Sequence, residues 1–454
     1  MAMETNEYRE QRLVSMKALA ELGFEPYGCK YDHDDLSKIR AEFEEGKAAR
    51  VAGRLMMIRR MGKMNFCTMN DGTDKFQLIF KRDELSETMF AAFKLLNLGD
   101  IIGAEGVLFT TQKGEKSLVV KEWTMLAKAL EQPPEKFHGL ADQEECYRRR
   151  YVDLMTNDES RERFFMRSEI LKETRKYLWS KGFCEVETPI LQSQAGGAAA
   201  KPFETHFNAL DQKMVLRIAP ELYLKRLVVG GMNKVYEVGR IFRNEGMDTK
   251  HNPEFTSIEL YQAYTDYKGM MDIVCEMYPM LAEKICGSTK ITYQGVELDL
   301  GNWERLTMVE AVKKYSGIDY YSWQSDEEAR ECAKAHHVEI PENATKGTVL
   351  VELFDAFVED KLIQPTFIYD YPVENSPLAK KKPENPLFTE RFEYFINCTE
   401  YGNAFSELND PIDQKQRFEK QVADRKAIEP DTKAEVDYDY INALEYGMPP
   451  TGGL

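Results

Sequence analysis

The stretch of sequence that decides the fold is residues 240–264, RIFRNEGMDTKHNPEFTSIELYQAY. Its last part alternates apolar and polar residues, which is typical of a β-strand. Its first part gathers two arginines, an asparagine and a glutamate around one phenylalanine, and then breaks at Gly246, which allows the chain to turn. We therefore expect strand, turn and strand here, with polar side chains concentrated around the turn.

Arg243 and Glu245 lie two residues apart, so on a strand their side chains would share one face. An arginine there can fork onto a phosphate, and the glutamate can orient it or accept from the amino group of a base. His251, Asn252 and Phe255 return as a second lining, in which Phe255 can stack on a ring and His251 can contact a polyphosphate. Singly, a surface ion pair, a loop histidine and a core phenylalanine explain them. Together, they favour a nucleotide site.

The composition is that of a soluble globular protein of two or three domains. The chain has 454 residues, of which 43% are hydrophobic and 30% are charged. No segment is apolar enough to span a membrane and the first residues, MAMETNEYREQR, have no apolar signal core, so we expect a cytoplasmic protein. Eight cysteines without a C-x-x-C pair predict reduced, mostly buried thiols.

The hydrophobic pattern divides the chain and predicts an α+β fold. We expect an N-terminal helical segment over residues 1–50, a small barrel of short strands over 51–130, and a linker over 131–156. A long helix begins near Asn157 and ends at Gly182. The strands and helices that follow lack a regular βαβ rhythm, so we predict an antiparallel sheet flanked by helices over 157–454.

The predicted barrel carries features of a nucleic-acid reader. The net charge of −17 disfavours nucleic acid, although a local basic face can act against an acidic background. Aromatic rings can stack on bases and amides can read their edges, as Phe66, Gln77 and the neighbouring Phe76 could do. Protein binding by a barrel with core aromatics explains this segment equally well. Basic residues cluster around the first hairpin: Arg54, Arg59, Arg60 and Lys63.

Two other elements point to specific roles. Glu393 and Glu400 lie seven residues apart, with Glu407 another seven on, and Mg²⁺ is bound by carboxylate oxygens together with substrate phosphates. We therefore take Glu393 and Glu400 as candidate Mg²⁺ ligands, the alternative being glutamates on solvated faces. Pro189 lacks the N–H that a sheet ladder needs, so it belongs at an edge or an interface.

Several motifs together resemble the class II lysyl-tRNA synthetases. They are FRNEG and HNPEFT within 242–256, GF-x-EVETP at 182–189, AGGAAAKPF at 195–203, RIAPELYLKRL at 217–227, SPLAK at 376–380, RFEYFI at 391–396 and GNAFSELND at 402–410. YRRRYVDL at 147–154 resembles the hinge of that family, and the resemblance covers the chain from its first helix to residue 454. It implies a five-stranded OB-fold that binds the anticodon, followed by a class II catalytic domain.

The resemblance also implies site residues. Arg243 would contact the α-phosphate of ATP and act in catalysis with Glu245, and Glu393 and Glu400 would hold Mg²⁺. Pro189 would lie at a homodimer interface. The positions implied for the lysine pocket are Gly197, Glu221, Glu259, Tyr261, Asn403, Phe405 and Glu407. Those implied for ATP are Arg243, Glu245, His251, Asn252 and Phe255, and those implied for the anticodon of tRNA(Lys) are Phe66, Gln77 and Glu115.

The sequence departs from the family at one end and leaves alternatives open. After GMPPTGGL the family continues into a glycine-rich strand and a helix with a further ATP-binding arginine, so we expect the catalytic domain to be incomplete at its C-terminal side. An aspartyl- or asparaginyl-tRNA synthetase is the nearest alternative, but it would need basic residues where three glutamates stand. A paralogue that binds tRNA or lysine without aminoacylation remains the other alternative. A lone catalytic domain that modifies protein lysines is disfavoured because the barrel is present.

Overall fold

The computed structural model describes the chain except for residues 1–6, 135–141, 199, 249–250 and 429–434. The side chains of four further residues near 428 are also outside the description. The chain forms two compact units, residues 1–165 and 166–454, which we describe one at a time.

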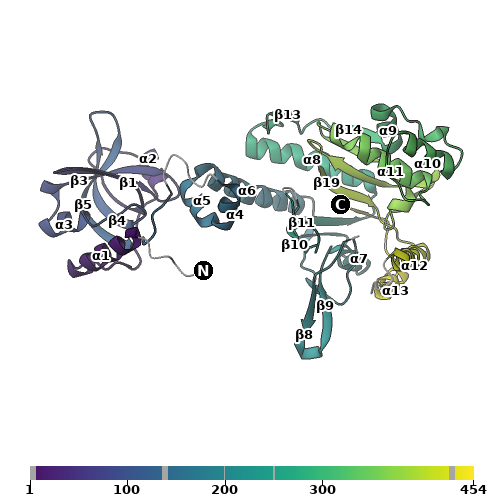
Figure 1. Cartoon of the computed structure of the whole chain (residues 1–454), viewed down its shortest axis with the longest axis horizontal. Coiled ribbons are helices and arrows are strands. Elements are labelled where there is room, and N and C mark those ends of the chain that lie inside the picture. The colour runs from purple at the N-terminus through teal and green to yellow at the C-terminus, as the bar shows by residue number, and fades with distance from the viewer. Residues whose placement is uncertain (1–6, 135–141, 199, 249–250, 429–434) are drawn as a thin grey trace. The chain divides into compact units, whose positions relative to one another are not determined.

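The first unit is built around a closed five-stranded barrel (Figure 1). Neighbouring strands are antiparallel except β3 and β5, which run parallel. The predicted five-stranded barrel is therefore confirmed. The strand order is β1-β2-β3-β5-β4. The bounds are β1 Ala48–Met61, β2 Met64–Asn70, β3 Lys75–Lys81, β4 Ile101–Thr110 and β5 Lys116–Ala127, with helices α1 Glu7–Glu21, α2 Leu36–Ala41 and α3 Glu87–Phe93.

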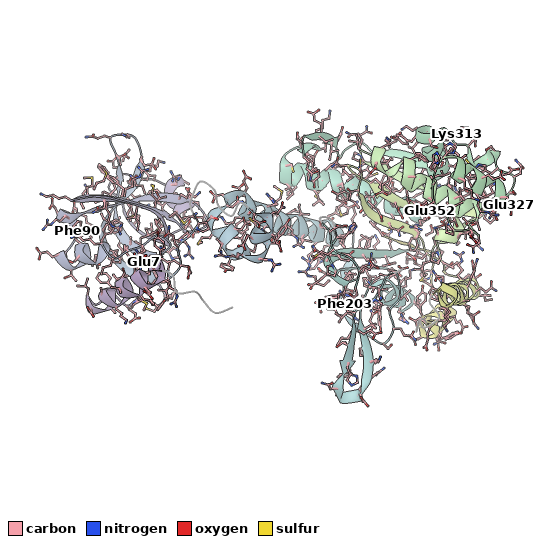
Figure 2. All side chains as sticks on the ribbon, viewed as in Figure 1. Glu7, Phe90, Phe203, Lys313, Glu327 and Glu352 are labelled. Carbon is pink, nitrogen blue, oxygen red and sulfur yellow. The ribbon has the colours of Figure 1, made fainter. Side chains whose placement is uncertain are left out.

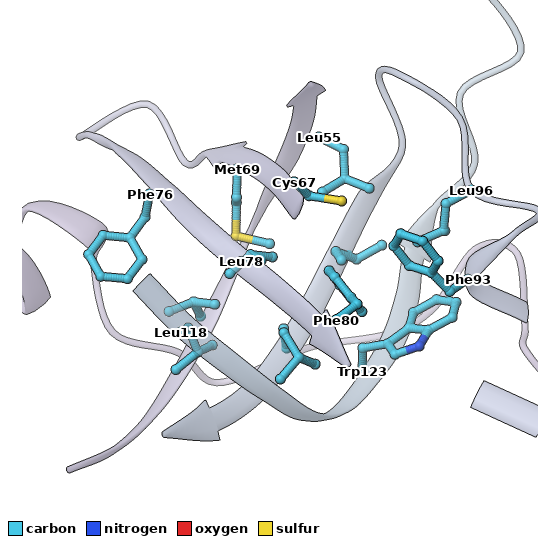
Figure 3. Close-up of a cluster of buried hydrophobic side chains, with 14 of the residues drawn as sticks. Leu55, Cys67, Met69, Phe76, Leu78, Phe80, Phe93, Leu96, Leu118 and Trp123 are labelled. Atoms are coloured by element: carbon cyan, nitrogen blue, oxygen red, sulfur yellow. The ribbon is translucent and has the colours of Figure 1, made fainter. Parts of the chain in front are cut away.

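Alternate strand residues fill the barrel, as the two-residue period of the sequence requires. Figure 3 shows Cys67, Leu78, Phe80 and Trp123 packed together inside it. Phe76 belongs to the same core and is only 1% exposed. The suggestion that Phe76 could stack on a base is therefore wrong, because its ring points to the inside of the closed sheet.

Helix α1 is attached to the barrel by a buried arginine. Arg12 donates hydrogen bonds to the backbone oxygens of Leu98 and Ala129 at 2.9 and 3.0 Å. Beside it, Lys128 and Asp100 form a fully buried ion pair of 2.7 Å. Buried charges need such partners, so these contacts fix where the N-terminal helix packs.

Three helices connect the barrel to the second unit in sequence, and an eight-stranded sheet forms the centre of that unit. The helices are α4 Gln143–Arg148, α5 Arg150–Thr156 and α6 Asp158–Ser180. The sheet order is β14-β15-β18-β19-β20-β11-β10-β6. The strand bounds are β6 Cys184–Glu185, β10 Lys234–Phe242, β11 Glu254–Ala263, β14 Glu304–Thr307, β15 Thr366–Tyr369, β18 Arg391–Phe395, β19 Glu400–Ser406 and β20 Thr451–Gly453.

The sheet is antiparallel at every pairing except β14 with β15 and β10 with β6. The predicted antiparallel α+β unit is thus confirmed, with a parallel pair at each edge. Smaller sheets are formed by β7 Leu191–Gln192, β8 Glu204–Phe207 and β9 Gln212–Leu216, by β12 Lys290–Tyr293 and β13 Val296–Asp299, and by β16 Lys381–Lys382 and β17 Asn385–Thr389.

Helices pack on the sheet, and charged side chains on their outer faces are exposed to solvent. Methionines of α8 pack on the sheet residues Phe367, Phe392 and Ala404. Lys313 of α9 and Glu327 of α10 are exposed (Figure 2). The bounds are α7 Glu221–Val229, α8 Tyr267–Cys286, α9 Met308–Ser316, α10 Asp326–Ala335, α11 Lys346–Phe357, α12 Pro411–Ile428 and α13 Tyr438–Glu445.

Two expectations from composition have different outcomes. Within the described part of the chain, no helix is both long and apolar enough to cross a membrane. The expectation of mostly buried cysteines is wrong, because only Cys67 of the eight is buried. Cys184 lies on the edge strand β6 and Cys286 is the last residue of α8, and both positions leave a small side chain open to solvent.

Candidate active site

The turn between β10 and β11 brings an arginine with unused donors next to an aromatic ring. The antiparallel pairing ends at Phe242 and Glu254. Arg243 and Glu245 therefore lie in a loop, and the prediction that they share a strand face is wrong. Pro253 explains the end of the ladder, because it accepts from the Arg243 amide at 2.8 Å but has no N–H to return.

Arg243 has the features of an anion-binding residue. Its Nε is buried and has no hydrogen-bond partner among the described residues. Its guanidinium carbon lies 5.3 Å from the centre of the ring of Phe255, the second residue of β11. A buried donor without a partner is costly, so this group is prepared for an oxygen-rich anion such as a phosphate.

The other predicted nucleotide residues lie along the same loop. Glu245 Oε1 accepts from the Lys201 amide at 3.3 Å. His251 and Asn252 are exposed at the start of the returning segment, and His251 Nδ1 lies 2.8 Å from an oxygen of Asp248. The structure thus places Phe255 against Arg243, while His251 makes its contact further out on the loop.

The predicted lysine pocket is assembled from three strands and one helix. Tyr261 of β11 and Phe405 of β19 are both in register with Gly453 of β20, so the three residues form one row across the sheet. Glu259 lies two residues before Tyr261 and accepts its hydroxyl hydrogen at 3.1 Å. Glu407 follows β19 directly and is 1% exposed.

Helix α7 closes this pocket with Glu221, its first residue, and Lys225 one turn later. The Lys225 ammonium lies 2.5 Å from Glu221 Oε1 and also pairs with Glu407. It lies 5.3 Å from the centre of the Phe405 ring. Three glutamates, one lysine and two aromatic rings therefore meet in one pocket, in which Glu259 and Phe405 are only partly buried.

Two glycines leave room for these carboxylates. A Cβ on Gly453 would lie 2.0 Å from Glu407 Oε1 and 2.5 Å from a ring carbon of Tyr261. Gly197 has φ +86°, and a Cβ there would lie 3.0 Å from the Glu221 Cβ. Only a residue without a side chain fits at Gly453 with the strands in this register.

Burial and like charge perturb the acids of the pocket. Burial, with the charge of Glu221, raises the pKa of Glu259 to about 8, although Tyr261, Lys225 and Arg243 oppose the rise. Burial also raises the pKa of Glu407, and Lys225 only partly opposes this. Burial alone would lower the pKa of Lys225, but Glu221 and Glu407 more than reverse it, so this lysine is charged. The pocket therefore has an excess of acid over base.

A second pair of acids lies on neighbouring strands. Glu393 of β18 faces Asn403 of β19, and Glu400 begins β19 opposite Phe395. Burial, together with the charge of Glu393, raises the pKa of Glu400 to about 7. Glu393 is held by the Tyr371 hydroxyl at 2.8 Å and by Arg391. Two close carboxylates fit a Mg²⁺ that completes its shell with phosphates and water, and the described residues contain no larger cluster of metal ligands.

Two of the predicted anticodon residues, Phe66 and Gln77, share the outer face of the barrel, and Glu115 lies in the turn just before β5. Phe66 is in register with Ile79, and Gln77 with Thr68 two residues away. Gln77 Nε2 donates to Ser117 Oγ at 2.8 Å, and that hydroxyl donates to the backbone oxygen of Glu115 at 3.2 Å. The structure therefore brings the three predicted positions together.

The basic cluster predicted near the first hairpin is only partly available. Arg59 and Lys63 are exposed. Arg54 is instead half-buried and donates to the Gly99 backbone oxygen at 2.8 Å. Arg60 donates to the Leu96 backbone oxygen at 2.7 Å. Both of these arginines therefore stabilise the barrel through hydrogen bonds to its backbone, in addition to contributing positive charge.

Sequence reasoning missed three residues at these sites. Lys225 was not singled out, although a glutamate and a lysine four apart on an apolar helix could have indicated it. Arg391 donates to Asn403 at 3.0 Å and also binds Glu393, so it joins the two predicted sites. Phe109 of β4, 37% exposed and in register with Ser117, extends the outer face of the barrel.

Comparison with known proteins agrees with this geometry. A family model described as tRNA synthetases class II (D, K and N) matches residues 142–454, and one described as OB-fold nucleic acid binding domain matches residues 49–126. A lysine–tRNA ligase of Staphylococcus saprophyticus is 49% identical over all of this chain and 94% of its own length. Those of Listeria monocytogenes and Thermoanaerobacter pseudethanolicus are 50% and 51% identical over 99% of this chain, covering 93% and 91% of their own lengths.

The sheet, the barrel and the matched family define a class II aminoacyl-tRNA synthetase, a type of enzyme that uses ATP. About half of the residues along the whole chain are identical to those of the lysine–tRNA ligases, which identifies the family within this class. The chain belongs to the family of the lysine–tRNA ligases.

Proposed function

We propose that this chain activates lysine with ATP and transfers it to the 3′ end of tRNA(Lys). The observation that carries the proposal is the cluster of buried Glu221 and Glu407 with the partly buried Glu259, beside Tyr261 and Phe405. Carboxylates and aromatic faces bind ammonium groups, whereas an aspartate or asparagine side chain would find no cation to bind there except the already paired Lys225. Gly197 and Asn403 would complete the lysine site.

The nucleotide would bind along the loop after β10. The unpartnered Nε of Arg243 supports a contact with the α-phosphate, and the Phe255 ring beside it supports stacking of the adenine. Glu245 would accept from the adenine amino group, and His251 and Asn252 would contact the outer phosphates. Glu393 and Glu400 would hold Mg²⁺, which supplies electrostatic stabilisation of the phosphates when it is bound.

The reaction would proceed in two steps. The lysine carboxylate oxygen attacks the α-phosphorus of ATP, the bond to the bridging oxygen breaks, and pyrophosphate leaves. Arg243 stabilises the negative charge that grows on the α-phosphate oxygens. A terminal ribose hydroxyl of tRNA then attacks the carbonyl carbon of lysyl-adenylate, AMP leaves, and the hydroxyl proton is lost. Positioning and charge stabilisation supply most of the acceleration.

The barrel would read the anticodon of tRNA(Lys). Phe66 would stack on a base, and Gln77 and Glu115 would read its edge. The outer face that Phe66 and Gln77 share supports this assignment, and exposed Arg59 and Lys63 would contact phosphates. We place the reaction in the cytoplasm, where tRNA, lysine and ATP occur together.

We infer that the enzyme acts as a homodimer. Helix α6 and the nearby segment around Pro189 expose several large apolar side chains in the second unit, which supports a protein interface there. Pro189 itself is exposed in the loop between β6 and β7. The exposed residues are Met166, Ile170, Trp179, Ile190 and Leu191.

Lysine-dependent exchange of pyrophosphate into ATP tests the proposed function. Exchange with lysine, and none with aspartate or asparagine, is expected from this chain with Mg²⁺ present. Exchange with aspartate or asparagine instead would contradict the substrate assignment. A folded protein that binds lysine in calorimetry without exchange would identify a binding paralogue and overturn the proposed activity.

A further inference from the structure

Lys225 is a charged residue completely buried inside the proposed lysine pocket. Its side chain is 0% exposed, and its ammonium contacts Glu221 and Glu407. It also lies 5.3 Å from the Phe405 ring centre and 6.0 Å from that of Tyr261. The protein thus places an ammonium of its own among the same groups that we propose for the substrate ammonium.

The net charge of the pocket depends on this lysine as well as on the three glutamates. Glu221, Glu259 and Glu407 carry three potential negative charges, and Lys225 neutralises one of them. Free lysine carries two ammonium groups, and its carboxylate has to face the α-phosphorus of ATP. Two uncompensated carboxylates therefore face two substrate ammonium groups.

The hydrogen bonds agree with the charge count. Glu407 Oε1 is buried and has no hydrogen-bond partner among the described residues. Glu259 accepts from the Tyr261 hydroxyl and retains further acceptor capacity. Lys225 therefore occupies one oxygen each of Glu221 and Glu407, while Glu407 Oε1 and the carboxylate of Glu259 can still accept from a cation.

We propose that Lys225 is a positioning residue for lysine specificity, which bridges Glu221 and Glu407 and leaves two acidic charges for the two ammonium groups of the substrate. This inference rests on the proposed function, because it assigns a role within the same pocket. An ion pair four residues apart on a solvated helix contributes little, but a buried one cannot lose one partner without leaving an uncompensated charge. Removal of Lys225 is therefore expected to force one pocket carboxyl to take up a proton.

Three variants separate charge balance from a merely structural role. Lys225→Met removes the cation at similar volume, and Glu221→Gln removes the charge of its ion-pair partner. The double variant removes both charges, so that two uncompensated carboxylates remain, as in the wild type. Lysine binding by calorimetry is expected to weaken about 10- to 100-fold in Lys225→Met, as for a buried group without its partner, while ATP binding is retained. The double variant is expected to bind lysine more tightly than Lys225→Met does. Lys314→Met, which breaks an exposed ion pair with Glu304, is the matched control and should bind lysine normally.

Proton release gives a second readout that a structural role would not change. Calorimetry in buffers of different ionisation enthalpy is expected to show that the number of protons released on lysine binding differs between Lys225→Met and the wild type, because the charge of Lys225 helps to set the protonation of the pocket carboxyls. Equal proton release, or a double variant whose loss is the sum of the two single losses, would overturn the proposal. If Lys225→Met alone does not fold, the double variant is compared with Glu221→Gln, since removing both members of a buried pair is often tolerated. Tighter lysine binding by the double variant than by Glu221→Gln is then expected, and weaker binding would overturn the proposal. A wild-type chain that does not bind lysine would instead contradict the proposed function.

Discussion

Glu259 is the residue whose ionisation should control lysine binding. Its pKa of about 8 lies above the usual value because of burial and the neighbouring Glu221, so the carboxyl is mostly protonated at pH 7 in the free pocket. A bound ammonium group favours the carboxylate and must displace that proton. Lysine affinity is therefore expected to rise with pH, by up to about tenfold per pH unit below pH 8, and to level off above it.

Glu259→Gln provides the check on this pH dependence. The variant should bind lysine more weakly at pH 8 and should lose most of the rise between pH 6 and 8, while ATP binding changes little. Calorimetry at several pH values measures both effects. If Glu259→Gln keeps the full pH dependence, another group is responsible and the assignment of Glu259 is wrong.

At the residue scale, motif resemblance could indicate the acids of the pocket but not their partners. Glu221, Glu259 and Glu407 stand in motifs that the resemblance covers, and the structure brings them together. The spacing of Glu221 and Lys225 could indicate an ion pair on one helix, but the burial of Lys225 could not be predicted, because it depends on strands far away in the sequence. The two-residue spacing of Arg243 and Glu245 implies a shared face only on a strand, but the pairing ends before Pro253 and both residues lie in a loop.

At the element scale, alternation predicted the barrel strands but not which face of each strand points inward. Phe66 and Phe76 lie on different faces, and only the closed barrel makes Phe76 core and Phe66 accessible. A period of two residues is the same for both faces, so burial has to come from the pairing of strands.

The outer face of the barrel can be tested with Phe66→Ala. Loss of a stacking platform of this kind costs about 1–3 kcal/mol per base, so tRNA(Lys) charging should fall while lysine-dependent pyrophosphate exchange remains. Tyr8→Ala on α1, another exposed aromatic residue of the first unit, is the control and should charge tRNA normally. An equal loss of exchange and charging in Phe66→Ala would remove this residue as an anticodon contact.

Strand β20 is an element that a single methyl group should disturb strongly. In Gly453→Ala the new Cβ would clash with Glu407 Oε1 and Tyr261, so we expect the free energy of unfolding to fall by about 1–3 kcal/mol and lysine binding to weaken. Chemical denaturation and calorimetry measure the two effects. Gly246→Ala, where a Cβ meets no atom within 4 Å, is the matched control for stability. Unchanged stability and binding in Gly453→Ala would show that this strand register is wrong.

At the scale of the whole molecule, oligomeric state follows from the exposed apolar side chains of α6. We expect a particle of twice the chain mass of 52.5 kDa in sedimentation, because an exposed tryptophan and its apolar neighbours are costly in water. Trp179→Glu should shift the protein towards the monomer. Tyr321→Glu, an equally exposed aromatic position on another part of the unit, should not. A wild-type monomer at micromolar concentration would contradict the inferred homodimer.

The division into a barrel and an antiparallel sheet could be expected from strand patterns and motifs, whereas the order of strands in the sheet could not. Residues 449–454, PPTGGL, give no clear strand signal because proline and glycine are both poor strand formers. Their pairing with β11 and β19 depends on partners far apart in the sequence, which a local pattern does not contain.

The central place of β20 also has a consequence for folding kinetics. The strands β14, β15, β18 and β19 connect to β11, β10 and β6 only through this short strand in the sheet order. Residues 451–453 come later in the sequence than the strands on both sides of β20, so β20 can join the two half-sheets only after those strands have been synthesised. Contacts between such distant segments close slowly, and until they close the facing edges of β11 and β19 are open to other chains. The joining of the half-sheets is thus the step at which nascent chains of this enzyme would benefit most from a chaperone.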